Sequence, residues 1–156
     1  MSLFRTLRPA LLLFLVLLLP ASLMAKELPT AGLVIQTKGG QQHHFTVELA
    51  ISAREQERGL MFRERMAPDA GMLFLYDTPV MASFWMKNTI LSLDMLFIEK
   101  DGTIANIYAD AEPGNLTPIR STKPVTGVLE INAGLASRLG IHPGDRVLHK
   151  AFGTAP

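Results

Sequence analysis

Four charged residues interrupt strongly apolar stretches of the sequence and are the first candidates for chemistry: Arg63, Lys87, Asp94 and Glu130. A charge that is buried without a partner is costly, so each of these side chains should have an ion pair or a ligand. If Lys87 and Asp94 leave opposite ends of one loop between neighbouring strands, they could meet above that loop. The planar guanidinium of Arg63 could hold a carboxylate through two hydrogen bonds.

These charges have a structural interpretation and a functional one. In the structural interpretation they form an ion-pair network that tethers loops to the sheet. In the functional interpretation, Lys87, Arg63 and the amide of Asn88 receive an anionic group such as a carboxylate or a peptide terminus. Trp85 then forms an apolar wall beside the ligand, unless it packs in the core. We favour a site that binds a small anionic or peptidic ligand.

Asp94 and Glu130 support a different interpretation, in which the two carboxyls are the acid/base pair of a hydrolase. The sequence has no Gly-x-Ser-x-Gly motif, no glycine-rich phosphate loop and no Cys nucleophile. We therefore favour binding over catalysis and assign no catalytic residue. A further alternative is a structural or assembly protein of the cell envelope that binds no small ligand.

Methionines suggest copper as another alternative, because thioethers are ligands for Cu(I). Those beyond the N-terminal segment are Met61, Met66, Met72, Met81, Met86 and Met95. They do not form Met-x-Met repeats, and most lie in apolar segments where methionine fills the core. No two histidines have the helical spacing of a zinc site. The sequence predicts no metal site and no cofactor, and copper binding through methionine stays a minor alternative.

The N-terminal 25 residues have the pattern of a secretory signal peptide. Arg5 and Arg8 precede an apolar run at residues 10–19, and Ala25 supplies the small residue before a cleavage site. The run is shorter than the roughly 20 residues of a membrane span. We expect an exported protein, periplasmic or extracellular, that touches a membrane only through an uncleaved signal peptide.

Charge balance gives no indication of nucleic-acid binding. The whole chain has 15 basic and 14 acidic residues, and removal of residues 1–25 leaves 13 basic and 14 acidic. A basic stripe of the kind that nucleic-acid binders use is not expected. The expected partner is a small molecule, a peptide or an envelope protein.

Apolar alternation predicts about seven short strands, at residues 33–37, 43–50, 71–76, 83–86, 93–99, 103–108 and 125–131, with a last short strand at residues 146–149. Two short helices are expected, one at residues 53–58 begun by a capping box of Ser52 and Glu55 and one that Asn132 caps and that ends near Leu139. Asp101-Gly102, between two of the predicted strands, predicts a hairpin turn. Residues 109–124 form a long loop that could cover a site. The pattern favours a mainly β (α+β) protein, a compact antiparallel barrel or sandwich. Its single domain spans residues 33–150, between a lead-in at 26–32 and a tail at 151–156.

A series of short motifs resembles a known family. In chain order they are Gly59–Arg63, Gly71–Phe74, Phe84–Thr89, Leu93-Asp94, Phe97-Ile98, Val128–Glu130, Gly140-Ile141 and Gly144-Asp145. The series is similar to a family of small, often exported bacterial and archaeal proteins known as a domain of unknown function, an ancient conserved region. The resemblance covers residues 46–148 and implies a β-barrel-like fold with small helices. It implies no activity, ligand or catalytic residue.

Overall fold

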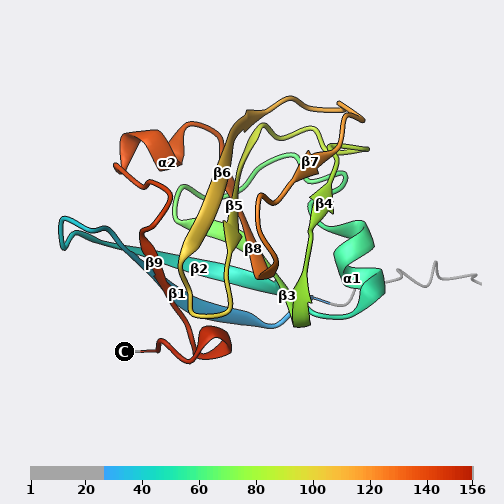
Figure 1. Cartoon of the computed structure of the whole chain (residues 1–156). Coiled ribbons are helices and arrows are strands. Elements are labelled where there is room, and N and C mark those ends of the chain that lie inside the picture. The colour runs from blue at the N-terminus through green and yellow to red at the C-terminus, as the bar shows by residue number, and fades with distance from the viewer. Residues whose placement is uncertain (1–26, 156) are drawn as a thin grey trace, which may run out of the picture.

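The computed structural model describes residues 27–155, and the predicted signal peptide lies outside the described residues (Figure 1). The strands are β1 (Thr30–Gln36), β2 (Gln42–Ala50), β3 (Ala70–Val80), β4 (Ser83–Phe84), β5 (Leu93–Ile98), β6 (Ile104–Ala111), β7 (Ile119–Arg120), β8 (Val125–Asn132) and β9 (Arg146–Leu148). The helices are α1 (Ala53–Arg58), α2 (Leu135–Arg138) and the 3-10 helix η1 (Lys150–Phe152). Within residues 27–155, no helix has the length and apolar character needed to cross a membrane.

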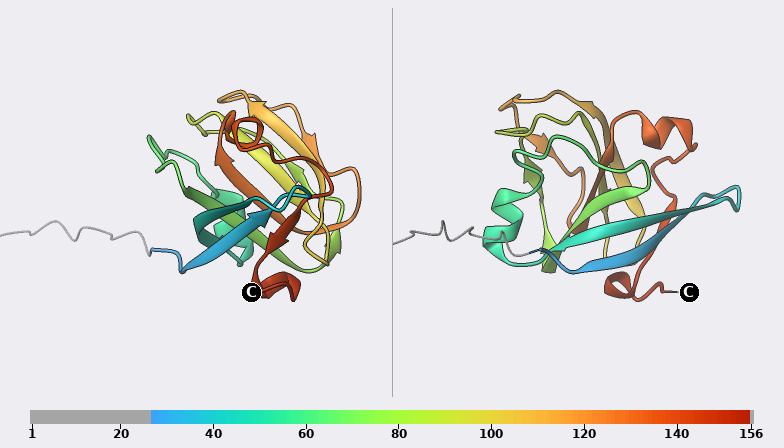
Figure 2. Two further views of the ribbon diagram at one scale, coloured as in Figure 1. Left: turned by 90° about the vertical axis from the view of Figure 1, so that its left-hand side faces the viewer. Right: turned by 180° about the vertical axis from the view of Figure 1, so that it is seen from behind.

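Seven strands form one sheet in the order β6-β5-β8-β3-β2-β1-β9, which curls into a half-barrel (Figure 2). A second, two-stranded sheet pairs β4 with β7. Neighbouring strands are antiparallel except β2 and β3, which run parallel and are joined by the segment that contains α1. The mainly β class with two short helices is confirmed. The parallel pair is the exception to the predicted antiparallel pattern.

Local sequence signals fix several elements. The Ser52 side chain accepts a hydrogen bond from the Glu55 backbone, and the Glu55 carboxylate accepts from the Ser52 backbone at 2.9 Å, which completes the predicted capping box of α1. Between β5 and β6, Gly102 has a φ of 87° that a non-glycine residue rarely adopts. The Asp101-Gly102 turn predicted from the sequence therefore joins these two strands.

The sheet is covered on both faces, so the chain has two apolar cores. The α2-side core contains α2 and the inward residues of most strands, including Leu129 and Ile131 of β8. The β4-side core lies on the opposite face and contains Met72, Met95 and Val128. Because side chains alternate between the faces of a strand, Glu130 shares the β4 side with Val128. A polar residue on that face lies inside apolar surroundings.

Three details differ from the predictions. Asn132 is the last residue of β8 rather than a helix cap, and α2 begins after Gly134. The strand predicted at residues 83–86 is shorter and contains only the two residues of β4. The loop predicted at residues 109–124 contains β7, which pairs with β4. Phe152, in the predicted tail, is buried in the α2-side core. In each case pairing or packing with distant segments decided the outcome.

Gly127 lies directly under the ring of Phe152, and this contact generates a stability prediction. A Cβ atom at position 127 would be 2.6 Å from Phe152 Cζ. We expect Gly127→Ala to lower the free energy of unfolding by about 1–3 kcal/mol, the usual cost of overpacking. Urea unfolding measures it. Gly32→Ala is the control, because nothing lies within 4 Å of a Cβ there; equal stability of the two variants would contradict the prediction.

Candidate functional site

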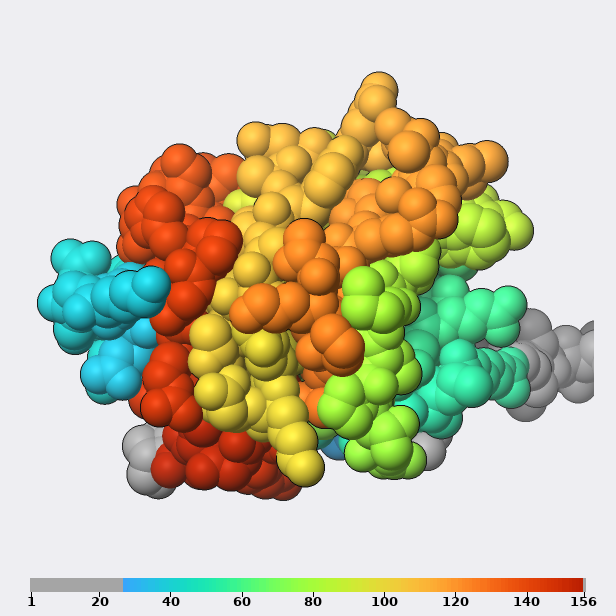
Figure 3. Space-filling model, in the orientation of Figure 1, coloured from blue at the N-terminus to red at the C-terminus, as the bar shows by residue number. Residues whose placement is uncertain are grey.

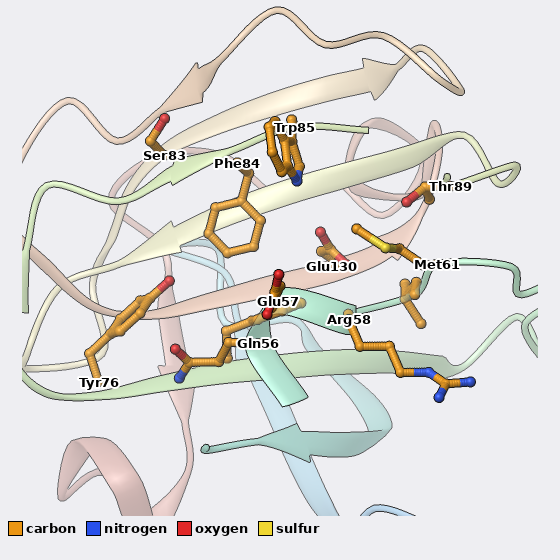
Figure 4. Close-up of a pocket in the computed structure, with 13 residues that line it drawn as sticks. Gln56, Glu57, Arg58, Met61, Tyr76, Ser83, Phe84, Trp85, Thr89 and Glu130 are labelled. Atoms are coloured by element: carbon orange, nitrogen blue, oxygen red, sulfur yellow. The ribbon is translucent and has the colours of Figure 1, made fainter. Parts of the chain in front are cut away.

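A cavity of about 270 Å³ opens on the β4 side of the sheet, between α1 and the segment that carries β4 (Figure 4). In the space-filling view, the segment where β3 ends and β4 begins lies beside α1 (Figure 3). Thirteen residues line the cavity: Gln56, Glu57, Arg58, Gly59, Leu60, Met61, Phe74, Tyr76, Ser83, Phe84, Trp85, Thr89 and Glu130. They come from distant parts of the chain that only the folded sheet brings together.

Glu130 lies at the centre of the sheet and faces this cavity. It is opposite Met72 on β3 and Met95 on β5, and it is only 4% exposed. Among the residues that the structure describes, none forms a hydrogen bond or ion pair with its carboxyl. Burial raises the pKa of Glu130 to about 8. The carboxyl is therefore mainly protonated at neutral pH.

Tyr76 is the second titratable group of the cavity whose pKa is raised by burial. It is half-buried at the cavity wall, and its pKa is raised to about 12, first by desolvation and then by the negative charge that Glu130 can carry. In Figure 4 the phenol of Tyr76 and the ring of Phe84 flank the same space. The floor and one wall are thus uncharged hydrogen-bonding groups at neutral pH.

Aromatic rings form the opposite wall. Phe84 is held by edge-to-face contacts, with its ring centroid 4.9 Å from Phe74 and 6.2 Å from Phe97. Trp85 is 49% exposed at the mouth, and Lys87 Nζ lies 5.2 Å from its ring centroid. The fixed Phe84 and the exposed Trp85 give the cavity an apolar side that is open to solvent.

Helix α1 supplies the charged rim, and Gln56 anchors it to the sheet. The Gln56 amide donates to the Leu75 carbonyl at 2.7 Å, and also lies within hydrogen-bond distance of the Ala50 and Ile51 carbonyls. The next two side chains diverge: Glu57 projects into the cavity and Arg58 extends away from Glu130 (Figure 4).

A second hollow, of about 400 Å³, adjoins the cavity and is lined by Arg58, Gly59, Met61, Phe62, Arg63, Glu64 and Arg65. Arg63 makes a two-pronged ion pair with Glu48, at 2.8 and 2.9 Å. This pair holds the 59–65 segment to β2. It is the two-hydrogen-bond contact with a carboxylate that we expected of the planar Arg63 guanidinium. Asn88 supports the same segment, because its carbonyl accepts from the Phe62 backbone at 2.8 Å.

Asp94 has a structural environment. It is fully buried, and its carboxylate accepts hydrogen bonds from the backbone N–H groups of Asp110 at 2.9 Å, Gly134 at 3.0 Å and Ala136 at 2.9 Å. It therefore ties β6 to the start of α2. Among the described residues, Lys87 and Asp94 form no ion pair, so their predicted meeting above the loop is not found.

The acid/base pair that a hydrolase would need is also not brought together. Met95 is the residue opposite Glu130, whereas Asp94 is opposite Ile131. Because side chains alternate across a strand, Asp94 and Glu130 point to opposite faces of the sheet. One substrate cannot reach both carboxyls.

The predicted candidates are therefore distributed over three places. Trp85 and Glu130 line the cavity, with Lys87 stacked over Trp85 at its mouth. Arg63 and Asn88 hold the adjoining segment, and Asp94 lies on the far face. Sequence reasoning missed Glu57 and Arg58, whose solvated helix gave no signal, and Tyr76, which ends an apolar run.

Buried methionines pack as predicted for core residues: Met72, Met86 and Met95 belong to the β4-side core. No group of three or more His, Asp or Glu side chains within residues 27–155 is arranged to hold a metal ion. Copper binding through methionine stays an untested alternative.

Comparison with known proteins places the chain among uncharacterised relatives. Residues 34–149 match the family DUF192, described as an uncharacterized ACR. A solved structure from Sinorhizobium meliloti 1021, described as a candidate transcription regulator, is 46% identical, with a TM-score of 0.79, and the match covers 80% of this chain and 97% of that one. A protein of unknown function from Novosphingobium aromaticivorans DSM 12444 is 45% identical, with a TM-score of 0.75, over 77% of this chain and 85% of that one. No curated protein matches.

Glu130 generates a prediction about pH. Its folded pKa of about 8 lies above the ordinary value of 4.5, so its contribution to stability is fully present below pH 4.5 and is lost as the pH rises toward 8. Relative to Glu130→Gln, the wild type should lose up to about 1.4 kcal/mol per pH unit across that window. Urea unfolding of both proteins between pH 4 and pH 9 measures the difference. A difference that does not vary with pH would contradict the prediction.

Asp94 should be far less tolerant of neutralisation. Asp94→Asn points an amide N–H at the backbone N–H of one of its three partners and weakens the other bonds, so we expect a loss of about 2–4 kcal/mol. Asp69→Asn is the control, since Asp69 is exposed. Thermal and urea unfolding measure both variants; a loss no larger than that of the control would show that the three hydrogen bonds contribute little.

Proposed function

We propose that this chain, which belongs to the DUF192 family, is an exported binding protein whose cavity over Glu130 takes the ammonium end of a small peptide or related amine. One observation carries the proposal: the Glu130 carboxyl is buried at the cavity floor without a partner among the described residues. Such a group costs stability in the free protein. A ligand that supplies the missing positive charge turns this cost into affinity.

The walls of the cavity support a cationic group with an apolar body. The rings of Tyr76, Phe84 and Trp85 line the same cavity as Glu130, and aromatic faces attract ammonium groups. Glu57 adds a second carboxyl at the rim. A ligand ammonium would favour the ionised form of Glu130, which releases its proton to solvent and accepts a charge-assisted hydrogen bond from the ammonium.

An anionic group has less support inside this cavity. Arg63, one of the residues expected to receive it, is already held by Glu48 at 2.8 Å. An anion in the cavity would also face Glu57 and Glu130. The peptidic form of the expected ligand therefore fits better, with its ammonium end inward.

Export is part of the proposal and rests on the signal-peptide pattern of residues 1–25. It would place the cavity where short peptides and amines are available outside the cytoplasm. The description of the S. meliloti relative would suggest a role on DNA. However, 15 basic and 14 acidic residues give this chain no charge excess for that purpose.

An envelope protein is the second candidate partner, favoured by exposed apolar side chains near the cavity. Phe62, Ile90 and Leu116 are each more than half exposed, in three loops joined by backbone hydrogen bonds such as Phe62 N–H to the Asn88 carbonyl at 2.8 Å. A partner that covers these side chains would bind independently of the charge on Glu130.

Phenylalanine amide and its N-acetyl derivative test the ammonium site by calorimetry. The amine should bind and release a proton near pH 7, because Glu130 must ionise, and its affinity should rise with pH up to about 8. Two buffers of different ionisation enthalpy count the proton. Glu130→Gln should weaken the amine at least tenfold, and the neutral derivative should bind neither protein.

Equal binding of the amine and the acetylated compound would contradict the proposal, as would unchanged affinity in Glu130→Gln. Binding that depends on Phe62 and Ile90 but is indifferent to Glu130 would instead support the envelope partner. Ser52→Thr, which keeps the helix cap and lies outside the cavity, is the matched control.

A further inference from the structure

The two hollows beside α1 adjoin each other and differ in their ionisable side chains. Arg58, Gly59 and Met61 line both of them. The first contains the carboxyls of Glu57 and Glu130, and the second contains three arginines and Glu64. Acidic and basic side chains diverge at two consecutive residues of one helix, because Glu57 projects into the first hollow while the Arg58 guanidinium extends away from Glu130 (Figure 4).

The arginines of the second hollow are not equivalent. Arg63 has both prongs of its guanidinium on Glu48. Within residues 27–155, neither Arg58 nor Arg65 has a carboxylate at ion-pair distance. The hollow that contains Arg63 therefore also contains two planar guanidinium groups without a carboxylate partner among the described residues. Such groups match the geometry of a carboxylate.

The backbone between these arginines is fixed. Met61 N–H donates to the Arg58 carbonyl at 3.0 Å and Arg63 N–H donates to the Leu60 carbonyl at 3.1 Å. Phe62 has a φ of 62° and is held in that conformation by its hydrogen bond to the Asn88 carbonyl. The segment is therefore a rigid turn, so a ligand would not have to order it.

From this arrangement we infer that the ligand is a zwitterionic short peptide, whose free carboxylate lies in the second hollow on Arg58 and Arg65 while its ammonium group lies on Glu130. The inference rests on the proposed function and adds the second charge. It gives the ligand one direction, since the reverse orientation would place a carboxylate on Glu57 and Glu130 and an ammonium among the arginines. It also predicts discrimination against peptides with a blocked C-terminus.

The dipeptide Phe-Ala and its C-terminal amide test this inference by calorimetry at 50 mM and 300 mM salt. Wild type should bind the free acid about tenfold more tightly than the amide at low salt, with a smaller ratio at high salt. The double variant Arg58→Gln, Arg65→Gln should bind both with the affinity of the amide. Arg54→Gln, an exposed residue of the same helix outside both hollows, should leave the ratio unchanged.

The outcomes separate the two proposals. If the amide binds as tightly as the free acid in wild type, the carboxylate site is wrong while the ammonium site stands. Equal weakening of both peptides by the double variant would also overturn the carboxylate site. If neither peptide binds wild type, and phenylalanine amide does not bind either, the proposed function itself fails.

Discussion

Burial of the sheet on both faces is the constraint on which the rest of the structure depends. Along β5 and β8 nearly every residue is buried, so each polar side chain on these strands needs compensation. Asp94 and Glu130 are the two acids that face this requirement. Asp94 receives three backbone N–H groups and becomes a joint between β6 and α2. Glu130 receives none from the described residues, and it is the one that faces a cavity.

This contrast separates structure from function within a single sheet. A buried carboxylate with three backbone donors has its hydrogen-bonding capacity satisfied and serves the fold. A carboxyl without donors is destabilised when charged, and it persists at a cost in stability. Such a cost is typical of binding and catalytic sites, where an outside group supplies the missing interaction. The physical difference between the two acids thus says more about their roles than their similar positions in apolar strands.

The mouth of the cavity is stiff for reasons that do not involve the cavity itself. Gln56 fixes α1 to the sheet, the Arg63–Glu48 pair fixes the following turn to β2, and Asn88 fixes that turn to the next loop. Arg63 and Asn88, which the sequence suggested as ligand-binding groups, therefore hold in place the turn that forms part of the cavity wall. Their role explains why charged and amide residues gather in segments that contain little regular structure.

The sequence by itself determined the hairpins, the capping box of α1, the mainly β class and the fact that Asp94 and Glu130 lie in buried strands. These features depend on residues close together in the chain, whose alternation and turn types act locally. Only the tertiary structure decided that Asp94 opposes Ile131 while Glu130 opposes Met95, so that the two acids face opposite cores. Strand register is set by long-range pairing, and a shift of one residue would exchange the faces. Long-range packing likewise makes site residues of Glu57, Arg58 and Tyr76, because they line one cavity with Glu130 only once α1 packs against the sheet.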